Sequence, residues 1–210
     1  MKICEIFKSI QGETSYAGLP AVFIRLFGCN LACNYCDTGY AKTEGRNSAM
    51  DEVLSEIAPY ECNLAVITGG EPLLQAAEVY PLIGNLQKNG YTVLLETNGS
   101  LPVNHVPPET VIVMDLKCPG SGESSRMYWD NMQWLKPRDE LKFVISSRRD
   151  YVWAKQVIQE YQPSCKILMG TVFGRLHPRE LAQWILEDKV NARLQLQLHK
   201  YIWEPDTRGV

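Results

Sequence analysis

Short apolar runs alternate along this chain with longer amphipathic stretches, and that alternation limits the folds the chain can adopt. The apolar runs predict strands at 21–28, 64–69, 92–97, 111–117, 141–146 and 166–170, and the amphipathic stretches predict helices at 50–58, 73–89, 149–161 and 177–189. A last run, 192–203, alternates like a strand with one polar face. Strands and helices in such succession are typical of a parallel α/β protein.

The length of the chain narrows this class further. With 210 residues it can bury one good core, but it is short for two full domains and shorter than the roughly 250 residues of a complete (β/α) barrel. We therefore expect a truncated or partial (β/α) barrel of about six parallel strands, formed by a single domain over residues 1–210. An N-terminal segment (about 1–20) and a C-terminal strand and tail (about 192–210) flank it.

Charge and hydropathy argue against several kinds of partner. The formal net charge is −3, so no broad basic surface indicates direct binding of nucleic acid. No apolar run approaches the ~20 residues of a membrane helix. Glu5, Lys8 and Gln11 interrupt the N-terminus where a signal peptide would be apolar. We expect a cytoplasmic protein that binds neither nucleic acid nor membrane.

Three cysteines on one polar loop, Cys29, Cys33 and Cys36, are the strongest chemical signal in the sequence. The cysteines at 4, 62 and 165 lie in or beside apolar runs and suit a core, whereas three thiols flanked by asparagine and aspartate do not. The spacing fits structural zinc, although no fourth ligand is close by. It also fits a [4Fe-4S] cluster with one iron open to a ligand. The loop alone does not decide between zinc and the cluster.

Polar residues also gather where the predicted strands end, which in parallel α/β folds is where sites are built. Thr68-Gly69-Gly70-Glu71-Pro72 follows one strand, and its glycines permit either a tight turn or close approach of the backbone to a ligand. Glu96-Thr97-Asn98-Gly99 is either a strand-to-turn transition or part of a site. Asp115 and Lys117 point to the same face, so they either pair or bind a ligand.

The cysteine loop, with Tyr35 before its last cysteine, and the Gly-Gly-Glu-Pro element together resemble the radical S-adenosylmethionine (SAM) enzymes. The resemblance implies that the three cysteines hold a [4Fe-4S] cluster whose open iron binds the amino and carboxylate groups of SAM. An external reductant of the flavodoxin or ferredoxin type would supply the electron that cleaves SAM to a 5′-deoxyadenosyl radical. The residues implied to contact SAM are Tyr35, Cys36, Asp37, Gly69, Gly70, Glu71, Glu96, Asn98, Asp115, Leu116 and Lys117.

Three stretches, at 9–30, 36–38 (CDT) and 196–203 (LQLHKYIW), resemble the 7-carboxy-7-deazaguanine synthases, which are small homodimeric lyases with a truncated barrel. The resemblance implies conversion of 6-carboxy-5,6,7,8-tetrahydropterin to 7-carboxy-7-deazaguanine. The radical abstracts the hydrogen at C6, the ring contracts, ammonia leaves and SAM is regenerated. Mg²⁺ assists by binding the substrate carboxylate. The product serves queuosine biosynthesis, a tRNA modification pathway, or another 7-deazapurine pathway.

The same resemblance assigns residues to the metal ion and to the substrate. Thr38 would bind Mg²⁺ through its hydroxyl, although alone it suggests only a turn or a helix cap. The implied substrate residues are Ile10, Gln11, Gly12, Glu13, Arg25, Thr68, His199 and Pro205, with Arg25 on the pterin carboxylate and Glu13 on the ring amino and N–H groups. Each has a plainer interpretation: Glu13 as a loop residue, Arg25 on the outer face, His199 as a core residue of a strand.

Two departures from the family keep alternatives open. Asp115-Leu116-Lys117 stands where some synthases read Ser-Pro-Lys, and it is closer to the glycyl-radical activating enzymes, which are the second enzyme hypothesis. Some synthases end soon after the His-Lys-Tyr motif, whereas residues 204–210 continue this chain, so a role for Pro205, Arg208 or the Val210 carboxylate is open. The non-enzyme hypothesis is a zinc-binding interaction module.

Overall fold

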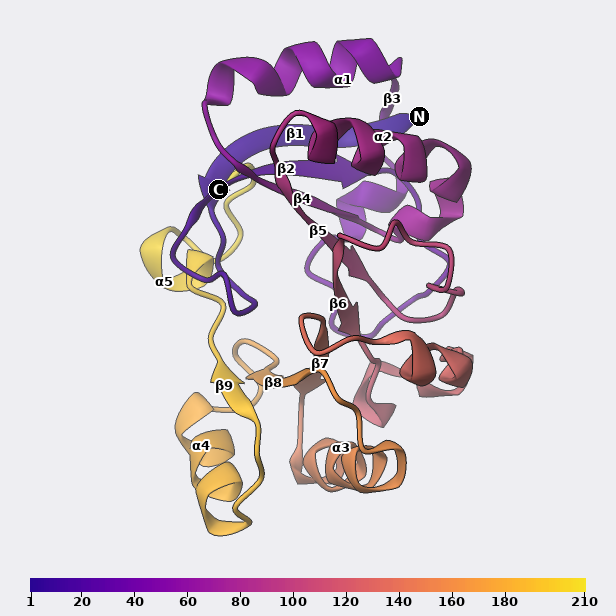
Figure 1. Ribbon diagram of the computed structural model, residues 1–210. Helices are drawn as coiled ribbons and strands as arrows, with labels where there is room; N and C mark the ends of the chain where they lie inside the picture. The colour runs from indigo at the N-terminus through magenta and orange to yellow at the C-terminus, as the bar shows by residue number, and fades with distance from the viewer.

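One nine-stranded sheet runs through the protein in the order β3-β1-β2-β4-β5-β6-β7-β8-β9. The computed structural model describes residues 1–210 (Figure 1). The strands are β1 (Lys2–Ile10), β2 (Pro20–Leu26), β3 (Arg46–Asn47), β4 (Leu64–Gly69), β5 (Thr92–Thr97), β6 (Val111–Asp115), β7 (Glu140–Ile145), β8 (Lys166–Thr171) and β9 (Arg193–Gln195). Seven strands, β2 and β4 to β9, are parallel, and at one edge β1 pairs antiparallel with both β2 and β3. The two edge strands do not pair, so this is an open, partial barrel, as predicted.

The longer helices all pack on one face of this sheet (Figure 1). They are α1 (Met50–Ile57), α2 (Ala76–Lys88), α3 (Arg148–Tyr161) and α4 (Pro178–Glu187), followed by the short α5 (His199–Ile202). Turns of 3₁₀ helix cover Gly39–Lys42, Ala58–Tyr60, Pro72–Gln75, Pro119–Ser121, Ser124–Arg126 and Trp129–Trp134. In α2 the buried residues Val79, Leu82, Ile83 and Leu86 recur at helical spacing, which turns one face to the core. None of the helices has both the length and the apolar character needed to cross a bilayer.

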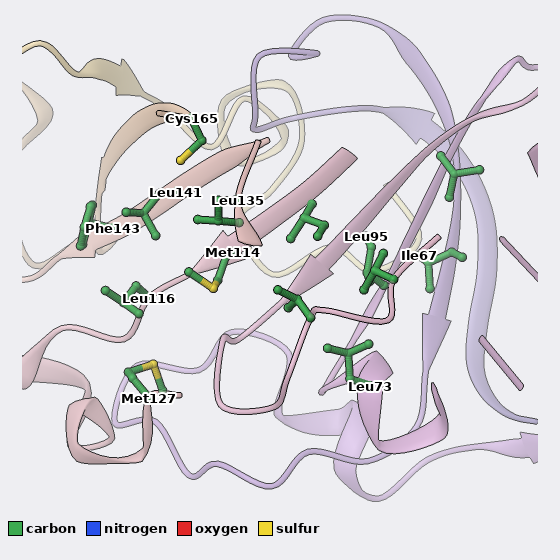
Figure 2. Close-up of a cluster of buried hydrophobic side chains, with 14 of the residues drawn as sticks. Ile67, Leu73, Leu95, Met114, Leu116, Met127, Leu135, Leu141, Phe143 and Cys165 are labelled. Atoms are coloured by element: carbon green, nitrogen blue, oxygen red, sulfur yellow. The ribbon is translucent and has the colours of Figure 1, made fainter. Parts of the chain in front are cut away.

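The main hydrophobic core lies between the sheet and the helices, where 37 buried residues form one cluster. Figure 2 shows part of it, with Ile67, Leu95 and Met114 from the neighbouring strands β4, β5 and β6. A second cluster of nine buried residues, among them Phe23 and Val66, lies on the opposite face, which we call the inner face. The strands therefore bury apolar residues on both faces, which explains their continuous apolar runs.

The N-terminal strand β1 is the longest element that the sequence did not predict. It pairs antiparallel with β2 from Ile3 to Ile10, and the register shifts between Ile3 and Glu5. That shift breaks the alternation of apolar and polar residues by which a strand is recognised, because residues two apart no longer share a face. The six predicted strands correspond to β2 and β4 to β8, and the four predicted helices are present with shifted ends.

The prediction of one strand over 192–203 is wrong. The strand β9 ends at Gln195, and the chain then turns into the helix α5. Leu198 N donates to the carbonyl oxygen of Gly12 at 2.9 Å, and Tyr201 N donates to the carbonyl oxygen of Leu198 at 2.9 Å. The backbone of this segment therefore bonds to an N-terminal loop and to itself instead of extending the sheet.

Candidate active site

Five polar side chains project from the inner face near the carboxyl ends of neighbouring strands. These are Arg25 on β2, Thr68 on β4, Glu96 on β5, Asp115 on β6 and Lys142 on β7, and we call this set the polar row. The strand register places Arg25 beside Thr68 and Asp115 beside Lys142. The first four each follow, two residues along the strand, an apolar member of the inner cluster, because side chains alternate between the faces of a sheet.

A loop of residues 11–19, which we call the strap, joins β1 to β2 and crosses the polar row. Gln11 Nε2 donates to Glu96 Oε1 at 3.3 Å, and the Glu13 carboxylate accepts from Lys142 Nζ. Ser15 N donates to the buried Glu140 at 3.0 Å. The strap therefore places the predicted substrate residues Gln11 and Glu13 against the inner face.

Charge is concentrated where the strap meets the polar row. Lys142 Nζ pairs with Glu13 and lies 3.7 Å from Asp115 Oδ2. Burial opposes ionisation of Glu13, but the charge of Lys142 and its hydrogen bond hold the pKa of Glu13 below its ordinary value. Burial likewise opposes the charge on Lys142, but Glu13, Asp115 and Glu96 raise the pKa of Lys142. Both groups are therefore ionised at neutral pH.

Glu96 lies among the predicted substrate residues rather than apart from them. Its carboxylate accepts from Thr68 Oγ1 at 2.8 Å and from Gln11 Nε2 at 3.3 Å. Burial raises the pKa of Glu96, although Lys142 and these two hydrogen bonds oppose the rise. We expected Glu96 to contact SAM, and the structure shows it bonded to Thr68 and Gln11, which were assigned to the substrate.

The three cysteines lie on the loop after β2, with Cys29 and Cys33 half-buried and Cys36 exposed. Asn98 Nδ2 lies 3.8 Å from Cys29 Sγ. Burial raises the pKa of the Cys33 thiol, and the Lys117 ammonium opposes that rise. No group of three or more His, Cys, Asp or Glu side chains is arranged to hold a metal ion. Each cysteine that holds a [4Fe-4S] cluster binds a different iron atom, so the three thiols do not need to converge on one point as they would around a single metal ion. Three free thiols on one loop therefore suit a cluster.

The glycine pair Gly69-Gly70 packs the end of β4 against the cysteine loop. A Cβ atom on Gly70 would lie 2.0 Å from the carbonyl oxygen of Gly28 and 2.7 Å from Cys29 Cβ. Gly69 has a φ of +137°, and a Cβ there would lie 2.3 Å from the carbonyl oxygen of Leu26. The atoms that exclude a side chain at both glycines belong to the chain itself, and a contact of the glycine backbone with SAM stays a prediction.

Glu71 follows the glycine pair and ties the end of β4 to the end of β5. Its carboxylate is fully buried and accepts from Leu73 N at 2.9 Å, Thr97 Oγ1 at 2.8 Å and Asn98 N at 2.7 Å. These contacts hold the ends of both strands together beside the cysteine loop. A contact of Glu71 with SAM stays a prediction.

The segment Asp115-Leu116-Lys117 contains the ion pair that the sequence allowed. Lys117 Nζ lies 3.0 Å from Asp115 Oδ2, whereas the buried Asp115 Oδ1 has no hydrogen-bond partner. The Leu116 side chain belongs to the main core on the opposite face. Leu116 could therefore contact a ligand only through its backbone, while Asp115 has an acceptor free for one.

The end of the cysteine loop meets the C-terminal segment. Asp37 Oδ2 accepts from Lys200 Nζ at 3.0 Å and from Gln197 Nε2 at 3.3 Å. Thr38 precedes the 3₁₀ turn at Gly39–Lys42 and donates its hydroxyl to Asp37 Oδ1 at 3.1 Å without capping the turn. Tyr35 lies on the same loop, and its hydroxyl donates to the carbonyl oxygen of Val144 at 3.2 Å.

Of the five remaining predicted substrate residues, four belong to or border the strap or the polar row, and the fifth, Pro205, does not. Arg25 faces inward and donates from Nε to Glu5 Oε1 at 2.7 Å, and Gly12 is so close to His199 that a Cβ on it would lie 2.4 Å from His199 Nδ1. His199 therefore reaches the strap from the start of a helix, not from a strand. Ile10 ends β1 beside the strap. Pro205 is exposed and makes no hydrogen bond with the polar row.

Sequence reasoning missed Lys142 and Lys200 as members of the site, and it placed Gln197 only on the polar face of the predicted last strand. Lys142 and Glu140 are charged residues, two apart, in a strand whose other residues are apolar, which is a signal of inward-facing polar groups. Gln197 donates from Nε2 to Glu13 Oε1 at 2.8 Å, and Lys200 pairs with Asp37. All three residues make their site contacts with segments distant in the chain.

Comparison with known proteins agrees with this geometry. Residues 23–113, which contain the cysteine loop and the glycine pair, match the radical SAM superfamily. The crystal structure of QueE from Escherichia coli superposes with a TM-score of 0.78 over 94% of both chains, at 25% sequence identity. The fold and the cysteine loop thus define a radical SAM protein with a partial barrel.

Full-length relatives make the family specific. The chain is 41% identical to a 7-carboxy-7-deazaguanine synthase from Koribacter versatilis, over 100% of both sequences. It is 44% identical to the 7-carboxy-7-deazaguanine synthase from Chlorobaculum tepidum, over 100% of this chain and 97% of that one. The chain belongs to the 7-carboxy-7-deazaguanine synthase family.

Proposed function

We propose that this protein is a radical SAM lyase that forms 7-carboxy-7-deazaguanine from 6-carboxy-5,6,7,8-tetrahydropterin with loss of ammonia. The observation that carries the proposal is the strap, which brings Gln11 and Glu13 onto the polar row beside the cysteine loop. Neither the glycyl-radical activating enzymes nor a zinc module explains this arrangement. The full-length relatives also favour the synthase.

The cofactors would lie at the carboxyl ends of the strands. Cys29, Cys33 and Cys36 would hold a [4Fe-4S] cluster, which together with SAM supplies the 5′-deoxyadenosyl radical. The free acceptor Asp115 Oδ1 and the neighbouring Lys117 would bind the charged groups of SAM. The other SAM contacts that we propose are Tyr35, Asp37, Gly69, Gly70, Glu71, Asn98 and the backbone of Leu116.

The substrate would lie between the strap and the polar row. Arg25 uses Nε for Glu5, which leaves its two terminal nitrogens to grip the pterin carboxylate. Glu13 is held ionised and would accept hydrogen bonds from the ring amino and N–H groups. Thr68 and His199 border the same space, and Glu96, bonded to Thr68 and Gln11, would be a further substrate residue.

Finer features of the family extend this proposal. Thr38 would bind Mg²⁺ through its hydroxyl, with Asp37 Oδ1 as an oxygen atom 3.1 Å from that hydroxyl. We also propose a cytoplasmic homodimer that takes electrons from a flavodoxin or a ferredoxin and does not bind nucleic acid. Its product would enter queuosine or another 7-deazapurine pathway.

Anaerobic turnover tests the proposed function. The protein, purified with its cluster, is incubated with 6-carboxytetrahydropterin, SAM, dithionite and Mg²⁺, and the products are identified by mass spectrometry. We expect 7-carboxy-7-deazaguanine and ammonia in equal amounts. A loaded cluster that cleaves SAM and yields no deazaguanine would refute the proposal and favour an activating enzyme, while a colourless, zinc-loaded protein would favour the zinc module.

A further inference from the structure

Two neighbouring inward side chains of β7 hold the strap in place. Lys142 pairs with Glu13, and Glu140, two residues earlier on the same strand, accepts from Ser15 N at 3.0 Å and also from the Ser15 hydroxyl. The strap residues are also two apart, so the contacts form a matched pair along one strand. The strap ends at β2, at one end of the polar row, and is fixed on β7, at the other end of the row.

Lys142 is the charged centre of these contacts. Its side chain is 13% exposed, and its ammonium group lies among three carboxylates, those of Glu13, Asp115 and Glu96. Asp115 Oδ2, at 3.7 Å, is a second carboxylate oxygen beside the ammonium group. Removal of one member of a buried ion pair leaves the other member unpaired, so the position of Glu13 depends on Lys142.

The orientation of Glu13 determines what it can bind. Lys142 bonds to Glu13 Oε2, Gln197 Nε2 donates to Glu13 Oε1 at 2.8 Å, and Glu13 N donates to Gln11 Oε1 at 2.9 Å. With both oxygens fixed, the remaining lone pairs of the carboxylate point in set directions. Gln11 shares this arrangement through the backbone of Glu13.

We propose that Lys142 is a positioning residue for the substrate: it holds the strap on β7 and orients Glu13 toward the N–H groups of the pterin ring. The substrate part of this inference rests on the proposed function, whereas the attachment of the strap does not. Two measurements on the same variants separate the two parts.

Hydrogen exchange of the strap amides tests the attachment. Lys142→Met, which keeps the length of the side chain without its charge, is expected to speed exchange of residues 11–19 about tenfold in the cluster-loaded protein. The matched control is Lys155→Met, which removes a lysine–aspartate pair at 2.7 Å between α3 and the end of α4, away from the site. Unchanged exchange in Lys142→Met would overturn the proposal.

Steady-state kinetics test the positioning role. Loss of a charge-assisted hydrogen bond predicts a KM for 6-carboxytetrahydropterin about 10- to 100-fold higher in Lys142→Met, with iron content unchanged and kcat less affected. Lys142→Arg keeps the charge and should recover part of the loss. If Lys142 acts through Glu13, adding Lys142→Met to Glu13→Gln should raise KM little beyond the value of Glu13→Gln alone. The double variant, Glu13→Gln with Lys142→Met, has no unpaired buried carboxylate at position 13, so it serves if Lys142→Met alone folds poorly.

The outcomes separate the two proposals. An unchanged KM in Lys142→Met beside an active wild type would overturn the positioning role. A wild type that does not turn over the pterin, but whose strap loosens in Lys142→Met, would refute the proposed function and keep the attachment of the strap.

Discussion

A methyl group added at Gly70 would push the end of β4 away from the cysteine loop. In Gly70→Ala the new Cβ would lie 2.0 Å from the carbonyl oxygen of Gly28, so the two segments must separate by about 1.4 Å to restore an ordinary contact of 3.4 Å. The atoms in the way are backbone and Cys29 Cβ at 2.7 Å, and neither can rotate aside. Overpacking of this kind costs about 2 kcal/mol, which corresponds to about 4–8 °C in Tm for a chain of this size.

Because Cys29 moves with the loop, the change should also reduce iron loading and lower turnover about 100-fold, the usual effect of a 1 Å misplacement in a site. Thermal unfolding, iron content and turnover are compared with those of Gly84→Ala. Gly84 lies in α2 with no atom within 4 Å of the new Cβ, and alanine there should raise stability by about 0.5–1 kcal/mol. If Gly70→Ala matched Gly84→Ala in Tm and in iron content, the close packing of β4 on the cysteine loop would be refuted.

Three further predictions concern the cluster, the substrate and the pH dependence of stability. Cys33→Ala should abolish iron loading while Cys62→Ala, on a buried thiol outside the loop, should not; retained iron in Cys33→Ala would exclude Cys33 as a ligand. Arg25→Ala should keep the cluster but weaken substrate affinity by about 10- to 100-fold, as expected for a lost bidentate ion pair, and unchanged affinity in equilibrium binding would exclude this contact. Burial raises the pKa of Glu96 in the folded protein above its ordinary value of 4.5. As pH rises, Glu96 therefore loses its proton in the unfolded chain before it does so in the folded protein. The stability of the wild type should fall, relative to that of Glu96→Gln, as pH rises from 4.5 through the raised pKa. Denaturant unfolding of both proteins between pH 4 and 8 measures the difference, and parallel curves would contradict the assignment.

Much of the fold could be predicted because the parallel strands are buried on both faces. Runs such as 64–67 and 111–114 are apolar throughout, so each marks a strand without reference to the rest of the chain. The strand β1 lacks this signal because a register shift after Ile3 breaks its alternation. The segment after Gln195 has the alternation of a strand, but its backbone bonds to the strap instead.

The residues of the candidate site likewise differ in how far the sequence could predict them. Residues local to one motif, such as the three cysteines and the glycine pair, could be found from spacing. The strand pattern around Lys142 indicates an inward-facing polar group but not its partner, because Glu13 is 129 residues away and only the fold brings the strap to β7. The resemblance to a family supplied the strap residues themselves, but not the strand on which they are held.

We expect this protein to contract a pterin ring by radical chemistry in which SAM is regenerated. The most direct test is the amount of 7-carboxy-7-deazaguanine formed per SAM, measured anaerobically by mass spectrometry with the substrate in large excess over SAM. We expect many molecules of product for each molecule of SAM. Consumption of SAM to methionine and 5′-deoxyadenosine without deazaguanine would contradict this expectation.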